Sequence, residues 1–285
     1  MKVPHAPWPT VAIVGVGMIG GSIAAALRAR RLADRVIGVG RSAASLAAAK
    51  RQGLVDEVAT DVAAVAAADL VVVATAVGSI PALLDQVDAV VRPGTLLTDA
   101  GSTKKSIVAA WEKRRRSRRG RFVGGHPIAG SHRRGPDAAD ARLFEGRVTV
   151  VTPVAATPAA DTESVAGFWS ALGSTVFMMP PREHDRLLAM TSHAPHVIAA
   201  AIAAATPAEA RRLTAGGWRD TTRIAAGDPD LWADILLDNA GDVAKALSRI
   251  AAVTEKILAA LESGDRRRLV SLLKRAKEDR DAVGS

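Results

Sequence analysis

Residues 15–20 have the glycine spacing of a dinucleotide-binding turn, GxGxxG (Gly15-Val16-Gly17-Met18-Ile19-Gly20). In such a turn the first glycine permits a tight bend, the second lets the backbone approach a pyrophosphate, and the third allows a helix to pack closely on a strand. The helix that follows supplies amide donors and a partial positive charge to the phosphates. We therefore predict a nucleotide cofactor site formed by Gly15, Gly17, Met18, Ile19 and Gly20, together with Thr75 at the end of a later strand.

The residues that end the second predicted strand, Gly40-Arg41-Ser42, bear on which cofactor binds. An NAD site usually has an Asp or Glu there, about 20 residues after the glycine turn, to bind the ribose hydroxyls. A carboxylate would repel the 2′-phosphate of NADP, whereas Arg41 can pair with it bidentately and Ser42 can donate a hydrogen bond. We predict a preference for NADP, with NAD also usable. The alternative is that Arg41 is only an exposed residue at the start of a helix.

His126 is the residue best suited to proton transfer. The chain has 6 His, no Cys and no Tyr, which excludes disulfides, a thiolate nucleophile, Cys-ligated metals and a phenolic acid, and we predict no metal site. His126 lies in the segment 124–131 (GGHPIAGS), and a second polar segment, residues 99–104 (DAGSTK), precedes it. Because each segment follows a predicted strand, we expect both at the carboxyl edge of the sheet, beside the cofactor. An imidazole titrates near neutral pH, so His126 is a candidate general base.

The net charge of +9 comes mostly from one segment. Seven of the nine residues 113–121 are basic, which leaves only +2 (9 minus 7) for the rest of the chain. Phosphate binding by such a segment would depend on salt and very little on sequence. Aromatic residues for stacking on bases are missing apart from Trp111 and Phe122 at its edges. We therefore favour a solvated helix end over nucleic-acid binding.

Short apolar runs alternate with helical patterns up to about residue 180. The predicted strands cover residues 11–14, 36–39, 70–74, 95–98, 122–123, 148–151 and 175–178. Strands separated by helix-length segments favour a doubly wound parallel sheet, and beyond Pro180-Pro181 the pattern is helical throughout. We predict an α/β protein with a Rossmann-type dinucleotide-binding domain over residues 1–180 and an all-helical domain for substrate binding and dimerisation over residues 181–285.

The longest uncharged run, residues 187–208, has 22 residues and is long enough to cross a bilayer. It contains His193, Pro195 and His196, and no second such run accompanies it. We interpret it as a buried helix, and as a candidate two-fold dimer interface because it is too apolar to be left exposed. Residues 1–10 lack the apolar stretch of a secretory signal, so we expect a cytoplasmic protein without membrane contact.

Taken together, these motifs resemble the prephenate and arogenate dehydrogenases of tyrosine biosynthesis. The resemblance covers nearly the whole chain. It runs through residues 15–20, 99–104 and 124–131 and continues through residues 192–196 (SHAPH), 220–225 (DTTRIA) and 228–232 (DPDLW). The nucleotide turn alone fits many dehydrogenases, whereas segment 124–131 together with 192–196 and 220–232 is specific to this family.

The resemblance implies an oxidative decarboxylation of a cyclohexadienol. Hydride leaves the carbon that bears the ring hydroxyl for the nicotinamide, and the ring carboxylate departs as CO2 as the ring becomes aromatic. His126 matches the family's histidine that hydrogen-bonds the ring hydroxyl and takes its proton, and Ser102 matches the serine that helps to position that histidine and the hydroxyl. His196, Arg223 and Ser131 match substrate-binding residues, and an arginine suits a bidentate carboxylate contact. For Arg223 the alternative is a surface ion pair with the aspartate three residues earlier.

Two substrates fit the family. Prephenate ends in a pyruvyl carboxylate, and arogenate ends in an alanyl group that adds an ammonium. Many relatives have an acidic residue after Ser131, where this chain has His132-Arg133-Arg134. If those side chains point inward, their charge favours the more anionic prephenate. Together with the predictions made above from Arg41 and from residues 187–208, this leads us to expect a homodimeric, NADP-preferring prephenate dehydrogenase, with arogenate as the alternative or additional substrate. A β-hydroxyacid dehydrogenase is less favoured, because that class relies on a helical-domain Lys and residues 187–213 contain none.

Overall fold

The structure is a computed structural model that describes residues 7–113, 118–130 and 133–283. It divides into two compact units, Met1–Asn239 and Ala240–Ser285. The first unit contains the sheets and the candidate site. The second unit contains helices α10 (Ala240–Glu262) and α11 (Arg266–Asp281). The domain boundary predicted at residue 180 lies between the last strand and the helices that follow it in the first unit, and it stays a prediction.

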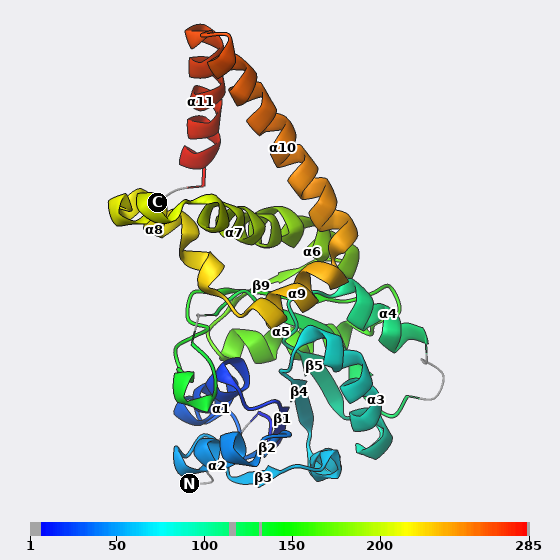
Figure 1. The fold of residues 1–285 in the computed structure, drawn as a ribbon. Coiled ribbons are helices and arrows are strands. Elements are labelled where there is room, and N and C mark those ends of the chain that lie inside the picture. Colours follow the sequence, from blue (N-terminus) through cyan, green and yellow to red (C-terminus); the bar gives the residue numbers. More distant parts are fainter. Residues whose placement is uncertain (1–6, 114–117, 131–132, 284–285) are drawn as a thin grey trace. The chain divides into compact units, whose positions relative to one another are not determined.

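Six strands of the first unit form a parallel sheet in the order β3-β2-β1-β4-β5-β6 (Figure 1). They are β1 (Thr10–Val14), β2 (Arg35–Val39), β3 (Glu57–Ala59), β4 (Leu70–Val73), β5 (Leu96–Asp99) and β6 (Arg121–Phe122). This order is that of a doubly wound nucleotide-binding fold, and the predicted α/β class is confirmed. Ligands of such folds bind beyond the carboxyl ends of the strands, where the strand order reverses between β1 and β4.

A second sheet contains β7 (Gly124–Pro127), β8 (Val148–Thr152) and β9 (Thr175–Met178). β7 is antiparallel to β8, and β8 is parallel to β9. The prediction of one parallel sheet is therefore wrong for the last strands, and the segment of His126 is itself partly a strand. Gly-Gly-His-Pro contains no β-branched residue, so its strand conformation comes from pairing with β8, where His126 lies opposite Val150.

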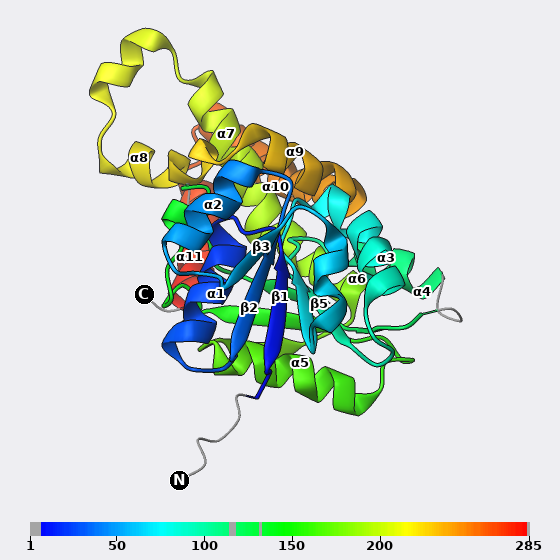
Figure 2. The same ribbon diagram turned by 90° about the horizontal axis from the view of Figure 1, so that it is seen from below.

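Helices cover both faces of the parallel sheet, which explains why its strands are apolar without alternation. Along β1, Val11 and Ile13 belong to one hydrophobic cluster, and Ala12 and Val14 belong to the other. The first cluster includes side chains of α1 (Met18–Ala29), α2 (Ala43–Arg51) and α5 (Ala159–Ala171). The second includes side chains of α3 (Ile80–Val90) and α4 (Lys105–Lys113). Figure 2 shows α1 and α2 on one side of the sheet and α3 and α4 on the other.

The other helical elements of the first unit fill its connections and follow β9. They are η1 (Val62–Ala67), η2 (Val77–Ser79), η4 (Pro136–Ala138), α6 (Pro181–Leu188), the π-helical turn η5 (Ala189–His193), α7 (Ala194–Ala205), η6 (Ala208–Leu213), α8 (Gly216–Thr222), η7 (Arg223–Ala226) and α9 (Pro229–Asp238). The π-helical turn has a local cause. Pro195 has no amide hydrogen to donate to the carbonyl of Thr191, so the helical ladder is interrupted there. The wider turn carries His193 into the interior.

The continuous helical stretch Pro181–Ala205 is the one place in the described chain where a helix is long and apolar enough to cross a membrane. Length and composition alone define this match, and a buried helix of a water-soluble protein meets the same criterion. It overlaps the uncharged run of residues 187–208. The expectation of no membrane contact stays a prediction.

The basic segment 113–121 is partly described, and its described arginines are engaged within the protein. Arg118 lies 4.0 Å above the ring of Trp111, and its Nη1 is 2.8 Å from Oδ1 of Asp85. Arg121 pairs with Asp161. These contacts support a structural role for this part of the segment, and the absence of a nucleic-acid partner stays a prediction.

Candidate active site

The glycine turn leaves open space at the N-terminus of α1. A Cβ on Gly15, whose φ is +99°, would lie 2.5 Å from the carbonyl oxygen of Ala74, and one on Gly20 would lie 2.0 Å from the carbonyl oxygen of Gly15. Real Cβ atoms do not approach so closely, so both positions require glycine. A Cβ on Gly17 would meet nothing within 4 Å. The backbone at Gly17 is therefore accessible to a ligand, and the turn fits the pyrophosphate of a dinucleotide.

The other residues predicted near the turn lie around it. Met18 and Ile19 begin α1 and are half-buried. Thr75 follows β4, and its Cγ2 is 2.7 Å from the position of a Cβ on the first glycine of the turn. A Cβ on Gly130 would lie 4.0 Å from Cε of Met18. The segment that carries His126 therefore reaches the nucleotide turn.

Arg41 and Ser42 follow β2 at the same edge of the sheet. The amide of Gly15 donates to the carbonyl oxygen of Val39, the last residue of β2, at 2.7 Å. Ser42 caps α2, because its Oγ accepts a hydrogen bond from the amide of Ser45 at 3.2 Å. Arg41 is exposed, and no ion pair among the described residues involves it. Its guanidinium is therefore available to an anion on the cofactor.

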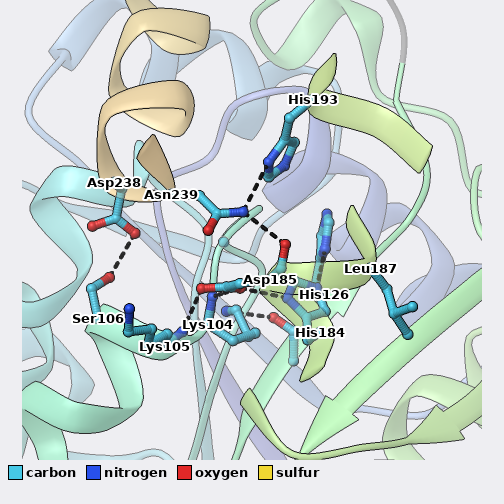
Figure 3. A network of polar contacts seen from close by, with 12 residues as sticks. Lys104, Lys105, Ser106, His126, His184, Asp185, Leu187, His193, Asp238 and Asn239 are labelled. Atoms are coloured by element: carbon cyan, nitrogen blue, oxygen red, sulfur yellow. Dashed lines mark hydrogen bonds and ion pairs between the residues drawn. The ribbon is translucent and has the colours of Figure 1, made fainter. Parts of the chain in front are cut away.

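All four histidines of the described chain gather in one cluster, which consists of His126, His184, His193 and His196. His126 is in β7, and its Nδ1 is 2.8 Å from Nε2 of His184, in α6 (Figure 3). Nδ1 of His184 is 2.7 Å from Oδ1 of the adjacent Asp185. The three side chains form a hydrogen-bonded series that ends at His126.

Asp185 is anchored by the start of α4 and by Asn239. Its Oδ1 accepts a hydrogen bond from the amide of Lys104 at 2.8 Å, and its Oδ2 accepts one from the amide of Lys105 at 3.0 Å. An anion is favoured at a helix N-terminus, where the amides have no intrahelical partners. Nδ2 of Asn239 donates to the carbonyl oxygen of Asp185 at 2.8 Å and lies 3.2 Å from Nδ1 of His193. These bonds join α6 and the π-helical turn to the loop that follows β5.

Lys104 and Asp99 form a fully buried ion pair, with both side chains 0% exposed. Nζ of Lys104 also donates to the carbonyl oxygen of Gly125 at 2.9 Å. Asp99 accepts two further hydrogen bonds, from the amides of Gly101 at 2.8 Å and Gly125 at 3.2 Å. The ion pair therefore joins the end of β5 to β7 directly before His126.

Burial keeps the imidazoles of this site neutral. It lowers the pKa of His126 well below its ordinary value, and the neighbouring His184 and Lys104 lower that pKa further. Burial also lowers the pKa of His184, in spite of its hydrogen bond to Asp185. For Asp185, burial acts to raise the pKa, but hydrogen bonds from His184 and the two α4 amides together lower it. At neutral pH the site therefore holds uncharged imidazoles beside the anionic carboxylate of Asp185, and the Lys104–Asp99 ion pair lies next to them.

His196, in α7, has an unpaired polar atom. Its ring stacks on the indole of Trp232, with centroids 3.6 Å apart and planes at 12°. Nδ1 is buried and has no hydrogen-bond partner among the described residues. Burial lowers the pKa of His196, and a hydrogen bond to the backbone of Ile224 opposes this shift. A buried nitrogen without a partner is suited to a hydrogen bond with a bound molecule.

The remaining predicted substrate residues are placed as follows. Arg223 begins η7 and is exposed, and the structure shows no ion pair between it and Asp220. Ser131 lies outside the described residues. Ser102 follows β5 and is half-buried, and the structure shows no hydrogen bond between it and His126, whose Nδ1 contacts His184. The roles assigned to these residues stay predictions.

Sequence reasoning missed the residues that hold His126, namely His184, Asp185, Lys104 and Asn239. Lys104 was part of a recognised polar segment but had no assigned role. His184 and Asp185 directly follow Pro181-Arg182-Glu183 at the start of a helix, where charged residues are commonplace. The signal that could have identified them is a strongly polar helix start placed just after the last strand, at the junction with the helical region.

A doubly wound sheet with an open glycine turn, together with a buried neutral histidine in a segment that reaches this turn, is the arrangement of an NAD(P)-dependent dehydrogenase. Two family models match the chain: "Prephenate dehydrogenase, nucleotide-binding domain" over residues 23–178 and "Prephenate dehydrogenase, dimerization domain" over residues 180–275. The chain belongs to the prephenate dehydrogenase family. This membership sets aside the β-hydroxyacid dehydrogenase alternative.

Individual relatives agree with the family match. A prephenate dehydrogenase of Bacillus subtilis is 34% identical over 96% of this chain and 76% of its own length. The crystal structure of a prephenate dehydrogenase from A. aeolicus, in complex with hydroxyphenyl propionate and NAD+, is 30% identical and has a TM-score of 0.89, covering 96% of this chain and 98% of that one. The crystal structure of Synechocystis arogenate dehydrogenase is 28% identical and has a TM-score of 0.82, covering 96% and 99%.

Proposed function

We propose that this protein oxidises prephenate to 4-hydroxyphenylpyruvate with loss of CO2 and that it prefers NADP as the hydride acceptor. The observation that carries the proposal is the placement of His126. Its imidazole is buried and neutral and is hydrogen-bonded through Nδ1 to His184, and its segment reaches the open glycine turn at Gly130, where a Cβ would lie 4.0 Å from Cε of Met18. A neutral imidazole beside a hydride acceptor is the arrangement that alcohol oxidation requires.

In this proposal the bound nicotinamide supplies the acceptor for the hydride that leaves the carbinol carbon. His126 accepts the proton of the ring hydroxyl, so that the carbon–oxygen double bond can form as the hydride departs. The bond between the ring and its carboxylate then breaks, CO2 leaves, and the electron pair completes the aromatic ring. Ser102, in the loop after β5, would help to position His126 and the hydroxyl.

Substrate binding is assigned to His196, Arg223 and Ser131. Nδ1 of His196 has no partner among the described residues and can bond the substrate. Trp232 holds the imidazole of His196 by stacking, and Gly227 leaves room for that stack because a Cβ there would lie 2.4 Å from Nε1 of Trp232. Arg223 is exposed and free of ion pairs in the described chain, so it is available for a bidentate carboxylate contact.

The positive charge of residues 132–134 is a weaker argument for prephenate over arogenate than the sequence alone suggests. Nη2 of Arg134 is 2.6 Å from Oδ2 of Asp228, so one of the extra positive charges is paired within the protein. Asp228 also caps α9 by accepting from the amide of Asp230 at 2.9 Å. Prephenate is favoured by the names of the matched family models, and the arogenate dehydrogenase among the relatives keeps arogenate as the second candidate.

The test of this function is a steady-state assay of the purified protein with prephenate and with arogenate, each with NADP and with NAD. We expect reduction of NADP with prephenate at the highest kcat/KM. Activity with arogenate alone would transfer the assignment to the second candidate. No reduction of either cofactor with either substrate would refute the proposed function.

Replacing Arg41 with alanine is expected to raise the KM for NADP at least roughly tenfold and to leave the KM for NAD nearly unchanged. The reason is that a charge-assisted hydrogen bond to a phosphate contributes about 1.5–3 kcal/mol, and only NADP carries the 2′-phosphate. Arg51→Ala is the matched control, because Arg51 is an exposed arginine at the opposite end of α2. Equal effects of Arg41→Ala on both cofactors would show that Arg41 does not bind the 2′-phosphate.

We also propose that the protein is a homodimer formed through residues 181–285 and that it works in the cytoplasm. The match of residues 180–275 to a dimerization-domain model supports the dimer. The absence of cysteine fits a reducing compartment. Sedimentation of the purified protein measures the mass directly.

A further inference from the structure

We propose that His184 and Asp185 are positioning residues that hold His126 with its ring proton on Nδ1, so that Nε2 is the atom that accepts the substrate proton. The inference rests on the proposed function for the identity of that substrate. The position of the ring proton, by contrast, is a property of the substrate-free protein and can be measured on its own.

The donor and acceptor roles in this series are set by Asp185. Its carboxylate accepts from the amides of Lys104 and Lys105, which can only donate. These donors stabilise the ionised form, and an ionised carboxylate has no proton of its own to donate. The 2.7 Å contact between Oδ1 of Asp185 and Nδ1 of His184 therefore places a proton on Nδ1 of His184.

The proton on Nδ1 of His184 determines which atom donates in the hydrogen bond between His184 and His126. A neutral imidazole carries one ring proton, so His184 with a proton on Nδ1 has an acceptor at Nε2. Nε2 lies 2.8 Å from Nδ1 of His126, and a hydrogen bond at that distance needs a donor on His126. Nδ1 of His126 must therefore carry the proton, and Nε2 holds the lone pair. A doubly protonated His184 would reverse the bond, but burial opposes that cation.

The same series prepares the site for the charge that appears during proton transfer. When Nε2 of His126 takes a proton, the imidazolium donates from Nδ1 to His184, and the carboxylate of Asp185 lies on the other side of that ring. The other charged and titratable groups near His126 are His193, Lys104 and, through Lys104, Asp99. Lys104 and Asp99 neutralise each other, so Asp185 is the anion left to oppose the imidazolium.

The positions of His184 and Asp185 are themselves well defined. Both side chains are buried, and Asp185 is bonded to the loop after β5 through two amides and to Asn239 through its carbonyl oxygen. Figure 3 shows these bonds converging on Asp185 from different elements. Because several hydrogen bonds hold the Asp185 side chain in place, it fixes the orientation of the His184 ring that it contacts. A fixed His184 ring can in turn orient the ring of His126.

The experiment compares the wild type with Asp185→Asn, His184→Leu, His184→Gln and the control Glu183→Gln. Glu183→Gln makes the same kind of change, from carboxylate to amide, at an exposed position of α6 two residues from Asp185. Glutamine at position 184 has an amide that can donate to Asp185 and a carbonyl that can accept from His126. Nitrogen-15 NMR of the ring nitrogens of substrate-free protein reports which nitrogen of His126 is protonated, and kinetics report kcat and KM separately.

We expect the wild type and Glu183→Gln to show His126 protonated on Nδ1 alone. Asp185→Asn and His184→Leu should show a mixture of the two tautomers and a roughly 10- to 100-fold lower kcat, with a KM that changes less than about twofold. His184→Gln should recover part of kcat and the Nδ1 signal. A merely structural role would lower the yield or the melting temperature without moving the ring proton.

A proton on Nε2 of His126 in the wild type would overturn the inference, as would an unchanged tautomer and kcat in Asp185→Asn. If His184→Leu does not fold, Asp185→Asn and His184→Gln decide the question between them. If the wild type oxidises neither prephenate nor arogenate, the proposed function fails, while the NMR measurement still supports or refutes the positioning role.

Discussion

Replacing His126 with asparagine should lower kcat by roughly 10²–10⁴-fold and leave the Kd of NADP essentially unchanged. Asparagine is smaller than histidine and can keep one hydrogen bond to His184, but it cannot accept a proton near neutral pH. The cofactor turn is formed by other residues, so binding of the nucleotide does not depend on the imidazole.

The pH dependence sharpens this prediction. Burial is the main cause that lowers the pKa of His126 well below its ordinary value of 6.5, and the neighbouring His184 and Lys104 lower it further. A general base works in its unprotonated form, so the kcat/KM of the wild type, which reports the free enzyme, should stay level as the pH falls through 6.5 and decline only at clearly lower pH. His126→Asn should have no such decline at any pH, because the group that titrates is gone.

The measurement is kcat and kcat/KM against pH for both proteins, with cofactor binding and the melting temperature as controls for folding. Near-normal turnover in His126→Asn, with intact folding, would show that another group takes the proton. A loss of wild-type activity centred at pH 6.5 or above would contradict the buried, neutral state assigned to this imidazole.

Replacing Lys104 with methionine should lower the free energy of unfolding by about 3–5 kcal/mol. Both side chains of the Lys104–Asp99 pair are fully buried, so the substitution leaves the carboxylate of Asp99 without its cation inside the protein. It also leaves the carbonyl oxygen of Gly125 without its donor. The total stability of a domain is about 5–15 kcal/mol, so this single change removes a large share of it.

Lys105→Met is the matched control. It removes the same kind of side chain one position along the chain, but the side chain of Lys105 is exposed, and its bond to Asp185 is made by the backbone amide, which the substitution keeps. We expect its unfolding free energy, measured by urea denaturation, to stay within about 0.5 kcal/mol of the wild type.

A double variant separates the two contributions to the lost stability, namely the unpaired buried charge and the lost packing of the Lys104 side chain. Asp99→Asn combined with Lys104→Met removes both charges, and the double variant should be less destabilised than the sum of the two single variants. Simple additivity, or a Lys104→Met variant as stable as Lys105→Met, would show that the ion pair contributes little to folding.

Much of the fold was predictable because its signals are local. The runs at residues 11–14, 36–39 and 70–74 are apolar and β-branched, and each became a strand of the parallel sheet. The cap at Ser42 and the helix after the glycine turn also follow from neighbouring residues. By contrast, β3 has only three residues at the edge of the sheet, and β7 has no residue with a strong strand preference, so neither carried a local signal.

The candidate site also has some features with a local sequence signal and others that depend on contacts between distant residues. The nucleotide turn lies within six consecutive residues, and His126 lies in a distinctive segment with glycines and a proline, so residue types and spacing were sufficient to select them. The bond of His126 to His184 joins positions 58 residues apart, and the bonds of Asp185 to α4 span 80 and 81 residues. No pattern in one sequence specifies which distant polar groups meet, so the sequence does not identify His184 as a partner of His126.

Residue chemistry alone therefore located the nucleotide turn and the imidazole, because glycine conformation, amide donors and an ionisable ring are properties of the residues themselves, and the resemblance of the motifs indicated the family. Only folding brings Asp185 against the start of α4 and His184 against His126. Those contacts determine that the imidazoles are neutral and, in our proposal, which ring nitrogen of His126 carries the proton. Burial and hydrogen-bond geometry change the pKa of an imidazole, and both arise only when distant segments pack together.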